Sequence, residues 1–216
     1  MAGRLQKLSC WVGLVLLAGC SSAGQLTVTP SSSSHASRLK MDFPTAVITS
    51  PQAGEYDVIL INDPADQSPP PVKGVLQPIH ADPVMQAITL HIHWKPTSSS
   101  LFHEAVIANA TLDWYILGGR DGRHYDLLQY HGAAYVMLDS TPSPGETVEL
   151  SIKDGQMTLE RREGDMRDVL GPSVLSGSVS AIRNDRKAAE LQAALRDRVA
   201  GARPGDAPMP AEGRLP

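Results

Sequence analysis

The side chains in this sequence that are best suited to binding a metal are histidines. His91 and His93 are separated by one residue in an alternating segment, so a strand there would place both imidazoles on one face. His131 lies in a later alternating segment and could approach them from a neighbouring strand. Other possible ligands are His103, Glu104 and His124. Because zinc binds imidazole and carboxylate groups, His91, His93 and His131 are candidate metal ligands. The same spacing also fits histidines on the solvent face of a half-buried strand, and we expect no bound metal or cofactor.

Motifs for nucleophilic or nucleotide chemistry are absent from the sequence. It contains no Gly-x-Ser-x-Gly elbow, no phosphate loop and no dinucleotide-binding glycine turn. Ser176 and Ser178 flank Gly177 inside a predicted strand, where a nucleophile would be badly presented. Tyr115 is of interest because it falls on the polar face of its segment, opposite Trp114. We therefore predict no catalytic residues and no enzymatic activity.

The N-terminus has the organisation of an export signal. Arg4 and Lys7 precede an apolar run at residues 10–17, which is too short to span a bilayer. The run ends in the residues Leu-Ala-Gly-Cys at positions 17–20. This order resembles the lipobox signal of bacterial lipoproteins. The resemblance implies that residues 1–19 are a signal peptide that is removed, and that Cys20 carries a diacylglycerol on its sulfur. Ser21, in place of an aspartate, implies transport to the periplasmic face of the outer membrane.

Cysteine content and charge limit the functions of the mature chain. Cys10 would leave with the signal peptide and Cys20 would become a thioether, so no thiol or disulfide would remain. Cysteine nucleophiles, cysteine-ligated zinc and iron–sulfur clusters are thereby excluded. Removal of Arg4 and Lys7 lowers the formal charge from −4 by two, to −6. An acidic chain of this kind is not expected to bind nucleic acid.

The chain of 216 residues is long enough for one domain with tails. Its 42% hydrophobic residues suffice for a core. Residues 20–40 are polar and rich in serine, which predicts a flexible tether after the lipidated cysteine, although a short edge strand at residues 26–29 is an alternative. Residues 201–216 are rich in proline and glycine and are expected to be disordered. A β-rich domain with a C-terminal helix is predicted over residues 41–200.

Alternating apolar and polar residues predict most of the strands in this domain. Residues 56–61 form a nearly continuous apolar run, typical of a strand buried on both faces. The other expected strands cover residues 45–49, 86–94, 104–117, 128–138, 148–152, 157–159 and 174–182. About eight strands with one late helix indicate a mainly β fold, a single antiparallel β-sandwich or barrel.

Asp154 and Gly155 lie between two alternating runs and favour a two-residue hairpin turn, since both positions of that turn need positive φ. This arrangement would place Ile152 beside Met157.

The segment 184–199 is predicted to be an amphipathic helix. Asn184 can cap its start, and Gly201 follows its end. Leu191, Leu195 and Val199 recur every four residues, so the narrow apolar stripe is expected to pack on a sheet.

These features favour a lipid-anchored protein of the cell envelope with a β-rich binding or structural domain and no catalytic activity. The membrane would be reached through Cys20, and an envelope protein or a small molecule is the expected partner. One alternative is a small-molecule carrier with its ligand in a barrel or sandwich cavity. Another is a metalloenzyme that depends on its histidines.

Overall fold

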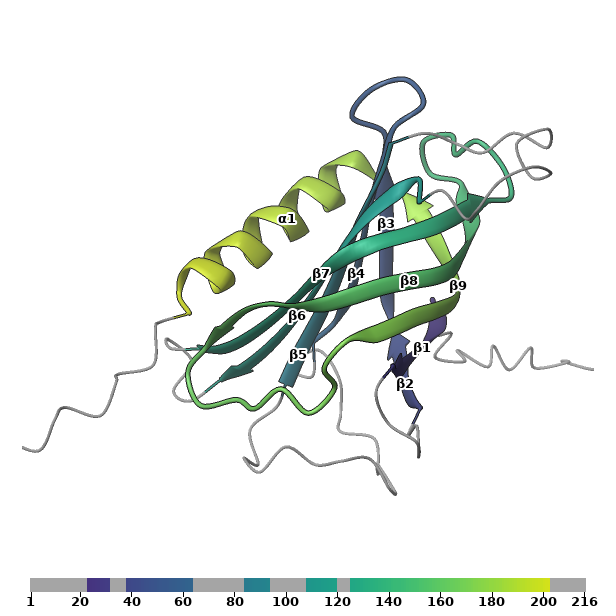
Figure 1. The fold of residues 1–216 in the computed structure, drawn as a ribbon. Helices are drawn as coiled ribbons and strands as arrows, with labels where there is room; N and C mark the ends of the chain where they lie inside the picture. Colours follow the sequence, from purple (N-terminus) through teal and green to yellow (C-terminus); the bar gives the residue numbers. More distant parts are fainter. Residues whose placement is uncertain (1–22, 32–37, 64–83, 94–107, 120–124, 203–216) are drawn as a thin grey trace, which may run out of the picture.

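The computed structural model describes residues 23–31, 38–63, 84–93, 108–119 and 125–202. These residues form a nine-stranded mixed sheet and one C-terminal α-helix (Figure 1). The elements are β1 (Gly24–Pro30), β2 (Leu39–Phe43), β3 (Thr45–Thr49), β4 (Tyr56–Asn62), β5 (Val84–Ile92), β6 (Ala110–Gly119), β7 (Tyr125–Leu138), β8 (Thr147–Glu163), β9 (Ser173–Arg183) and α1 (Asp185–Ala200). The prediction of a mainly β domain with a C-terminal helix is confirmed.

The sheet closes on itself through its last strand. From β3 to β9 each strand pairs antiparallel with the next, and β9 also meets β3 in a short parallel contact at Val47–Ile182 and Ile48–Arg183. β1 pairs antiparallel with residues 173–179 of β9, before the residues that meet β3, and β2 pairs with β1. The expected fold is thus corrected in two respects. Nine strands form a single sheet rather than the sandwich or regular barrel of about eight strands, and the sheet is mixed rather than wholly antiparallel.

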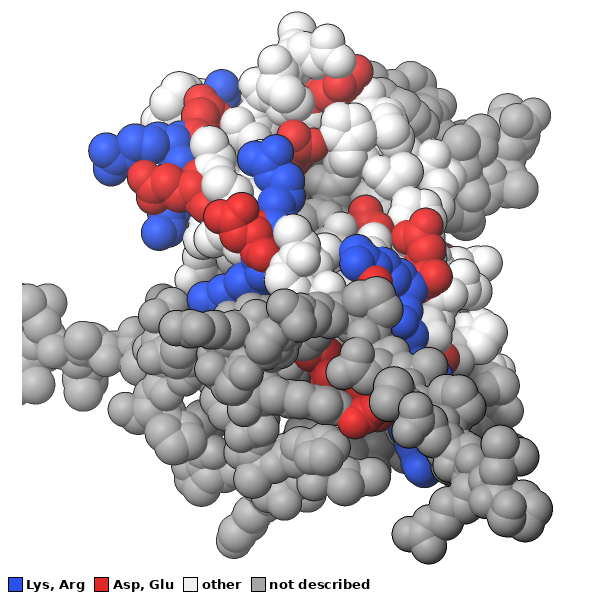
Figure 2. Space-filling model, turned by 90° about the vertical axis from the view of Figure 1, so that its left-hand side faces the viewer, with Lys and Arg blue, Asp and Glu red and all other residues white. Residues whose placement is uncertain are grey.

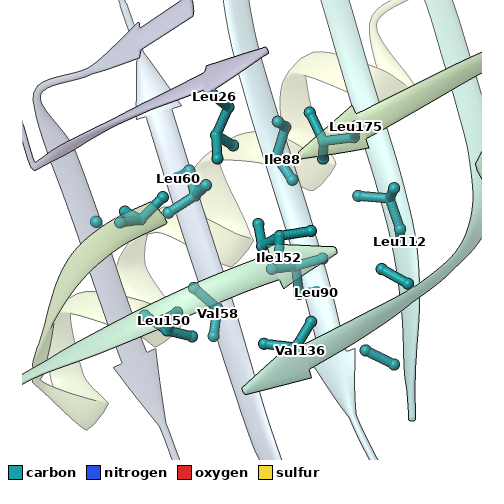
Figure 3. Packing of buried hydrophobic residues seen from close by; sticks show 14 of the residues in the cluster. Leu26, Val58, Leu60, Ile88, Leu90, Leu112, Val136, Leu150, Ile152 and Leu175 are labelled. Carbon is teal, nitrogen blue, oxygen red and sulfur yellow. The ribbon is translucent and has the colours of Figure 1, made fainter. Parts of the chain in front are cut away.

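Side chains from one face of every strand fill the interior that the sheet encloses (Figure 3). Alternation along β4 and β5 sends Val58, Leu60, Ile88 and Leu90 inward, where each is at most 1% exposed. The labelled side chains of β1, β6, β7, β8 and β9 point toward the same space in Figure 3. These contacts form the larger of two hydrophobic clusters among the described residues.

The second cluster lies on the outside of the sheet, beneath α1. Its sheet residues are Val47, Ile59, Ile61, Met85, Ala87, Leu117 and Leu127. Ala188 and Leu195 of α1 are buried against them, with Leu191 and Val199 partly buried. Strand β4 is therefore covered on both faces, as its apolar run predicted. The predicted packing of the helix on a sheet face is confirmed.

Two sequence features fix the ends of α1. The Asn184 side chain accepts a hydrogen bond from the backbone N–H of Lys187, as an N-cap does. Gly201 follows the helix as expected, but its φ of −76° is right-handed, so no left-handed cap forms. Ala202 is buried in the outer cluster. Order therefore extends two residues into the tail that was predicted to begin at 201, and residues 203–216 lie outside the described residues.

The segment predicted as a tether contains a strand of the sheet. Leu26 and Val28 of β1 are fully buried, because β1 lies between β2 and β9 and turns these side chains inward. A side chain on Gly24 would meet the backbone oxygen of Ser178 at 2.4 Å, so only glycine permits this approach. The ordered domain thus begins at Ala23 rather than at residue 41. The alternative of a strand at residues 26–29 is confirmed, but β1 is not an edge strand, because β2 lies outside it.

The Asp154–Gly155 pair forms a bulge within β8, so the predicted hairpin turn is wrong. Opposite β9, Ile152 pairs with Gly177 and Gly155 pairs with Leu175, which leaves Lys153 and Asp154 facing a single residue. Asp154 has φ +50°, the left-handed conformation that aspartate tolerates. The positive φ that aspartate tolerates in a hairpin turn here allows β8 to bend while it stays paired with β7 and β9.

Candidate functional site

The predicted histidines form two separate groups on the outer surface of the sheet. His91 on β5 faces Asp57 on β4, with Nδ1 of the histidine 2.5 Å from Oδ1 of the aspartate. Glu55 Oε2 lies 3.8 Å from the other ring nitrogen, and the ring of His93 contacts His91 edge to face. His131 is on β7, beyond β6, so it does not belong to this group.

The second group contains His131, Asp113 and Glu160 from three adjacent strands. Nδ1 of His131 lies 3.0 Å from Oδ1 of Asp113. The Gln129 amide donates to Asp113 at 3.2 Å and to Glu160 at 3.3 Å, so it links the two carboxylates. One ligand atom from each of His131, Asp113 and Glu160 lies within 4.8 Å of the other two. This donor set, one imidazole and two carboxylates, is chemically suited to a divalent cation.

His91 also has two carboxylate neighbours, but Asp57 and Glu55 approach opposite nitrogens of its ring. Among the described residues, only the His131 group brings three ligand atoms within 4.8 Å of one another. His103, Glu104 and His124, the other candidates for a third ligand, lie outside the described residues. Glu160 was not anticipated, because a bulge between Gln129 and Tyr130 sets its position against β7.

The protonation of His131 is coupled to Asp113. The hydrogen bond to that carboxylate raises the pKa of His131 above its usual 6.5, partial burial opposes the shift, and the charges of Asp113 and Glu160 add to it. The folded protein therefore keeps His131 protonated to a higher pH than a free histidine. A cation bound here would have to displace that proton.

A groove of about 410 Å³ runs between α1 and the sheet next to this group. It is lined by Thr89, Tyr115, Arg161, Gln192, Leu195, Arg196, Val199 and Ala200. A smaller hollow of about 190 Å³ shares Thr89 and Gln192 with the groove and extends to Asp57, His91 and Asp113. The two acid–histidine groups and the groove thus belong to one continuous surface along α1.

Tyr115 is the titratable side chain most strongly affected by this surface. Burial raises its pKa to about 12, and the nearby charges of Asp113 and Glu160 act in the same direction. A hydrogen bond with Thr89 and the charge of Arg161 partly oppose the shift. The tyrosine therefore stays neutral at ordinary pH and can act as a hydrogen-bond donor. The sequence had singled out Tyr115 by its place on the polar face of its strand.

Charges of both signs surround the groove. Arg161 is paired with Glu163, with 2.6 Å between Nη2 and Oε1. Arg196 extends from α1, where its Nε donates to the backbone oxygen of Gln192 at 3.4 Å. The view onto the α1 side shows basic and acidic side chains mixed over this part of the molecule (Figure 2). An anionic group on a ligand would find its nearest cationic partners in Arg161 and Arg196.

The interior of the sheet is occupied by large side chains. Trp114 and Tyr130 are both fully buried there and stack with ring centres 5.3 Å apart. The Tyr130 hydroxyl donates to Asp168 at 2.6 Å; burial and this hydrogen bond both raise the pKa of Tyr130. Both of the hollows described above open on the outer surface rather than into this core.

Comparison with protein-family models, with curated proteins and with solved structures gave no match for this chain. Within the ranges that the structure describes, no helix is long and apolar enough to cross a membrane.

Proposed function

We propose that the protein is a lipid-anchored protein of the bacterial cell envelope, whose β-rich domain binds a small molecule non-catalytically in the groove beside Tyr115. The anchor would be Cys20, and the expected site is the periplasmic face of the outer membrane. Support for the anchor comes from the resemblance of residues 1–20 to a lipobox signal. The described part of the domain begins at Ala23, three residues after Cys20.

The groove is the observation that carries the binding proposal. Its volume of about 410 Å³ lies within the range of about 300–1,000 Å³ that is usual for small-molecule sites. Leu195 and Val199 provide an apolar wall, while Tyr115, Gln192 and Arg196 provide hydrogen-bonding and charged groups. A ligand with an apolar body and an acidic group would match this combination. In the carrier alternative the ligand lies inside the sheet, where Trp114 and Tyr130 now occupy space.

Two helix variants test the groove. Gln192→Trp would place a large ring in the groove, whereas Arg186→Trp would change the same helix at a side chain that is 90% exposed. The lipidated proteins would be extracted in detergent, and small molecules that copurify would be identified by mass spectrometry. We expect a compound that accompanies the wild type and the Arg186→Trp variant and is lost from Gln192→Trp. A compound retained equally by both variants would contradict binding in the groove.

The anchor is tested separately by Cys20→Ser. We expect the wild type to stay with membranes after an alkaline carbonate wash and the variant to be released. A variant that remained in the membrane pellet would contradict lipid attachment at Cys20.

A further inference from the structure

Hydroxyl and amide side chains adjoin one another on the outer surface where β1, the middle of β9 and Ser151 of β8 meet. Pairing places Gln25 beside Ser178 and Ser178 beside Ser151, while Thr27 pairs with Ser176. We name this area the hydroxyl face; its residues are Gln25, Thr27, Ser151, Ser176, Ser178 and Ser180. All six side chains are exposed or partly exposed, since their neighbours along each strand turn inward. None of the described elements covers them.

The start of the ordered domain lies at the edge of the hydroxyl face. The backbone N–H of Ala23 donates to Phe43, and the backbone oxygen of Ala23 accepts a hydrogen bond from the N–H of Ser180. These two bonds, at 2.9 and 2.6 Å, hold Ala23 against β2 and β9. The chain that leads back toward Cys20 therefore leaves the domain beside Ser180.

The distance from Ala23 to Cys20 is short. Only Ser21 and Ser22 separate these two residues, so their Cα atoms can be at most about 11 Å apart. The polar region of one membrane leaflet is itself about 5–8 Å thick. If the acyl chains on Cys20 are in the membrane, the domain surface around Ala23 must lie at the lipid headgroups.

The chemistry of the hydroxyl face suits this position. Serine, threonine and glutamine both donate and accept hydrogen bonds, and so can pair with phosphate and ester groups of lipids. The six residues themselves carry no charge, and exposed charges of both signs border them. Asp42 pairs with Gln25 and Glu149 with Ser180, while Lys40 pairs with Thr27 and Lys153 lies two residues after Ser151. Lys40 and Lys153 offset the repulsion that Asp42 and Glu149 would meet at an anionic membrane, and the six uncharged side chains add none.

We infer that the hydroxyl face rests on the headgroups of the membrane that holds the lipid on Cys20. This inference depends on the lipid anchor of the proposed function. The helix α1 packs on β3, β4 and β7, away from β1 and β2 (Figure 1). In this orientation α1 and the groove beside Tyr115 face away from the membrane and remain open to ligands.

Single-cysteine labelling tests this orientation, because the mature chain would have no other free thiol. Ser178→Cys places a fluorescent probe on the hydroxyl face, and Ala193→Cys places the same probe on the exposed side of α1. The lipidated variants are reconstituted in vesicles of phosphatidylethanolamine and phosphatidylglycerol that contain a lipid with a spin-labelled headgroup. We expect the probe at position 178 to be quenched several-fold more than the probe at position 193.

The possible results separate the two proposals. If the proteins do not float with the vesicles, both the anchor and the membrane-facing surface are refuted. If the proteins float but both probes are quenched equally, or the probe at 193 more strongly, the anchor stands and the orientation is overturned. The unlabelled Ser178→Cys protein provides a further check on the vesicles. If it forms disulfide-linked dimers, the hydroxyl face contacts a second copy of the chain, and the proposed orientation is overturned.

A longer connection to the lipid provides the control. About twenty glycine and serine residues inserted between Ser22 and Ala23 would give the domain a root-mean-square reach of roughly 25 Å. We expect this variant to float as before while quenching at position 178 falls toward the value at position 193. Unchanged strong quenching would show that the face binds lipid by itself, independently of the short connection, and would contradict the role given to chain length.

Discussion

The two halves of the outer surface are built on the same strand alternation but carry different side chains. Under α1, the outward residues of β3, β4 and β5 are apolar, including Val47, Ile59 and Ala87. In the middle of β9 the outward residues Ser176 and Ser178 are serines, while inward Leu175 and Val179 are apolar. The inner face is thus predominantly apolar in both halves, and the outward residues show whether another element covers the strand.

The two halves therefore differ in how they contribute to stability and to binding. The half covered by α1 obtains a second hydrophobic core, and the groove forms where the helix meets polar outward residues such as Thr89 and Tyr115. The hydroxyl face has no such core and contributes little to stability beyond its backbone pairing.

Removing α1 should be the most damaging change to the covered half. Truncation after Asn184 exposes Ile59 and Val47 and removes the buried contacts of Leu195 and Ala188. Since burying one leucine side chain contributes about 1.5–3 kcal/mol, we expect the free energy of unfolding to fall by at least about 3 kcal/mol. Urea denaturation measures the loss, and truncation after Ala202 is the control that should leave the midpoint unchanged. Equal midpoints for the two truncations would mean that α1 does not stabilise the sheet.

One substitution in each half compares how much a single side chain contributes to the free energy of unfolding. Leu195 is 5% exposed beneath α1, so Leu195→Ala should cost about 2–4 kcal/mol. Ser178→Ala on the hydroxyl face should change stability by no more than about 0.5 kcal/mol. Chemical denaturation of the domain produced without its lipid would measure both changes in the free energy of unfolding. A cost for Ser178→Ala similar to that for Leu195→Ala would indicate that the hydroxyl face is covered within the domain itself.

The bulge in β8 should give an intermediate effect within the uncovered half. Asp154 has φ +50°, a conformation that a β-branched residue adopts only with strain, so Asp154→Val should destabilise the domain by about 1–2 kcal/mol. Asparagine tolerates this conformation, and Asp154→Asn should therefore keep nearly full stability. If valine were as stable as asparagine at this position, Asp154 would not need the left-handed conformation.

The smallest effect is expected from the Asp113–His131 pair. Asp113→Asn removes the charged partner that raises the pKa of His131, so an NMR titration should show this pKa moving down toward 6.5. Because the folded state raises this pKa, the pair stabilises fully below pH 6.5 and its contribution disappears as pH rises through the folded-state pKa of His131. With side chains 47% and 26% exposed, the contribution should be below about 1 kcal/mol. Asp57→Asn is the control, and an unchanged His131 titration in Asp113→Asn would contradict the coupling.

Regular patterns allowed the sequence to predict most elements of the fold. The strand at Thr45–Thr49 follows from a short apolar run, and the helix cap at Asn184 follows from local hydrogen bonding. The predictions for β1 and for Asp154 failed because local preference was compatible with two outcomes. A short alternating stretch such as 26–29 becomes a strand only when partners such as β9 are available, and those partners lie far away in the sequence.

The candidate site was less predictable, since it depends on strand register and on where α1 crosses the sheet. The spacing of His91 and His93 correctly placed them together. The contact of His131 with Asp113 depends on the pairing of β6 and β7, and the position of Glu160 depends on a bulge. Tyr115 could be assigned to the polar face of its strand, but the groove around it exists only because Gln192 and Arg196 arrive from α1.

The lipid on Cys20 is the central claim, because both the location of the protein and the orientation of its two halves depend on it. Mass spectrometry of the N-terminal peptide of the protein purified from bacterial membranes tests this claim most directly. We predict a peptide that begins at Cys20 and carries the added mass of a diacylglycerol, with a further acyl group on its amino nitrogen. A peptide that retains residues before Cys20, or one in which Cys20 has a free thiol, would contradict the account.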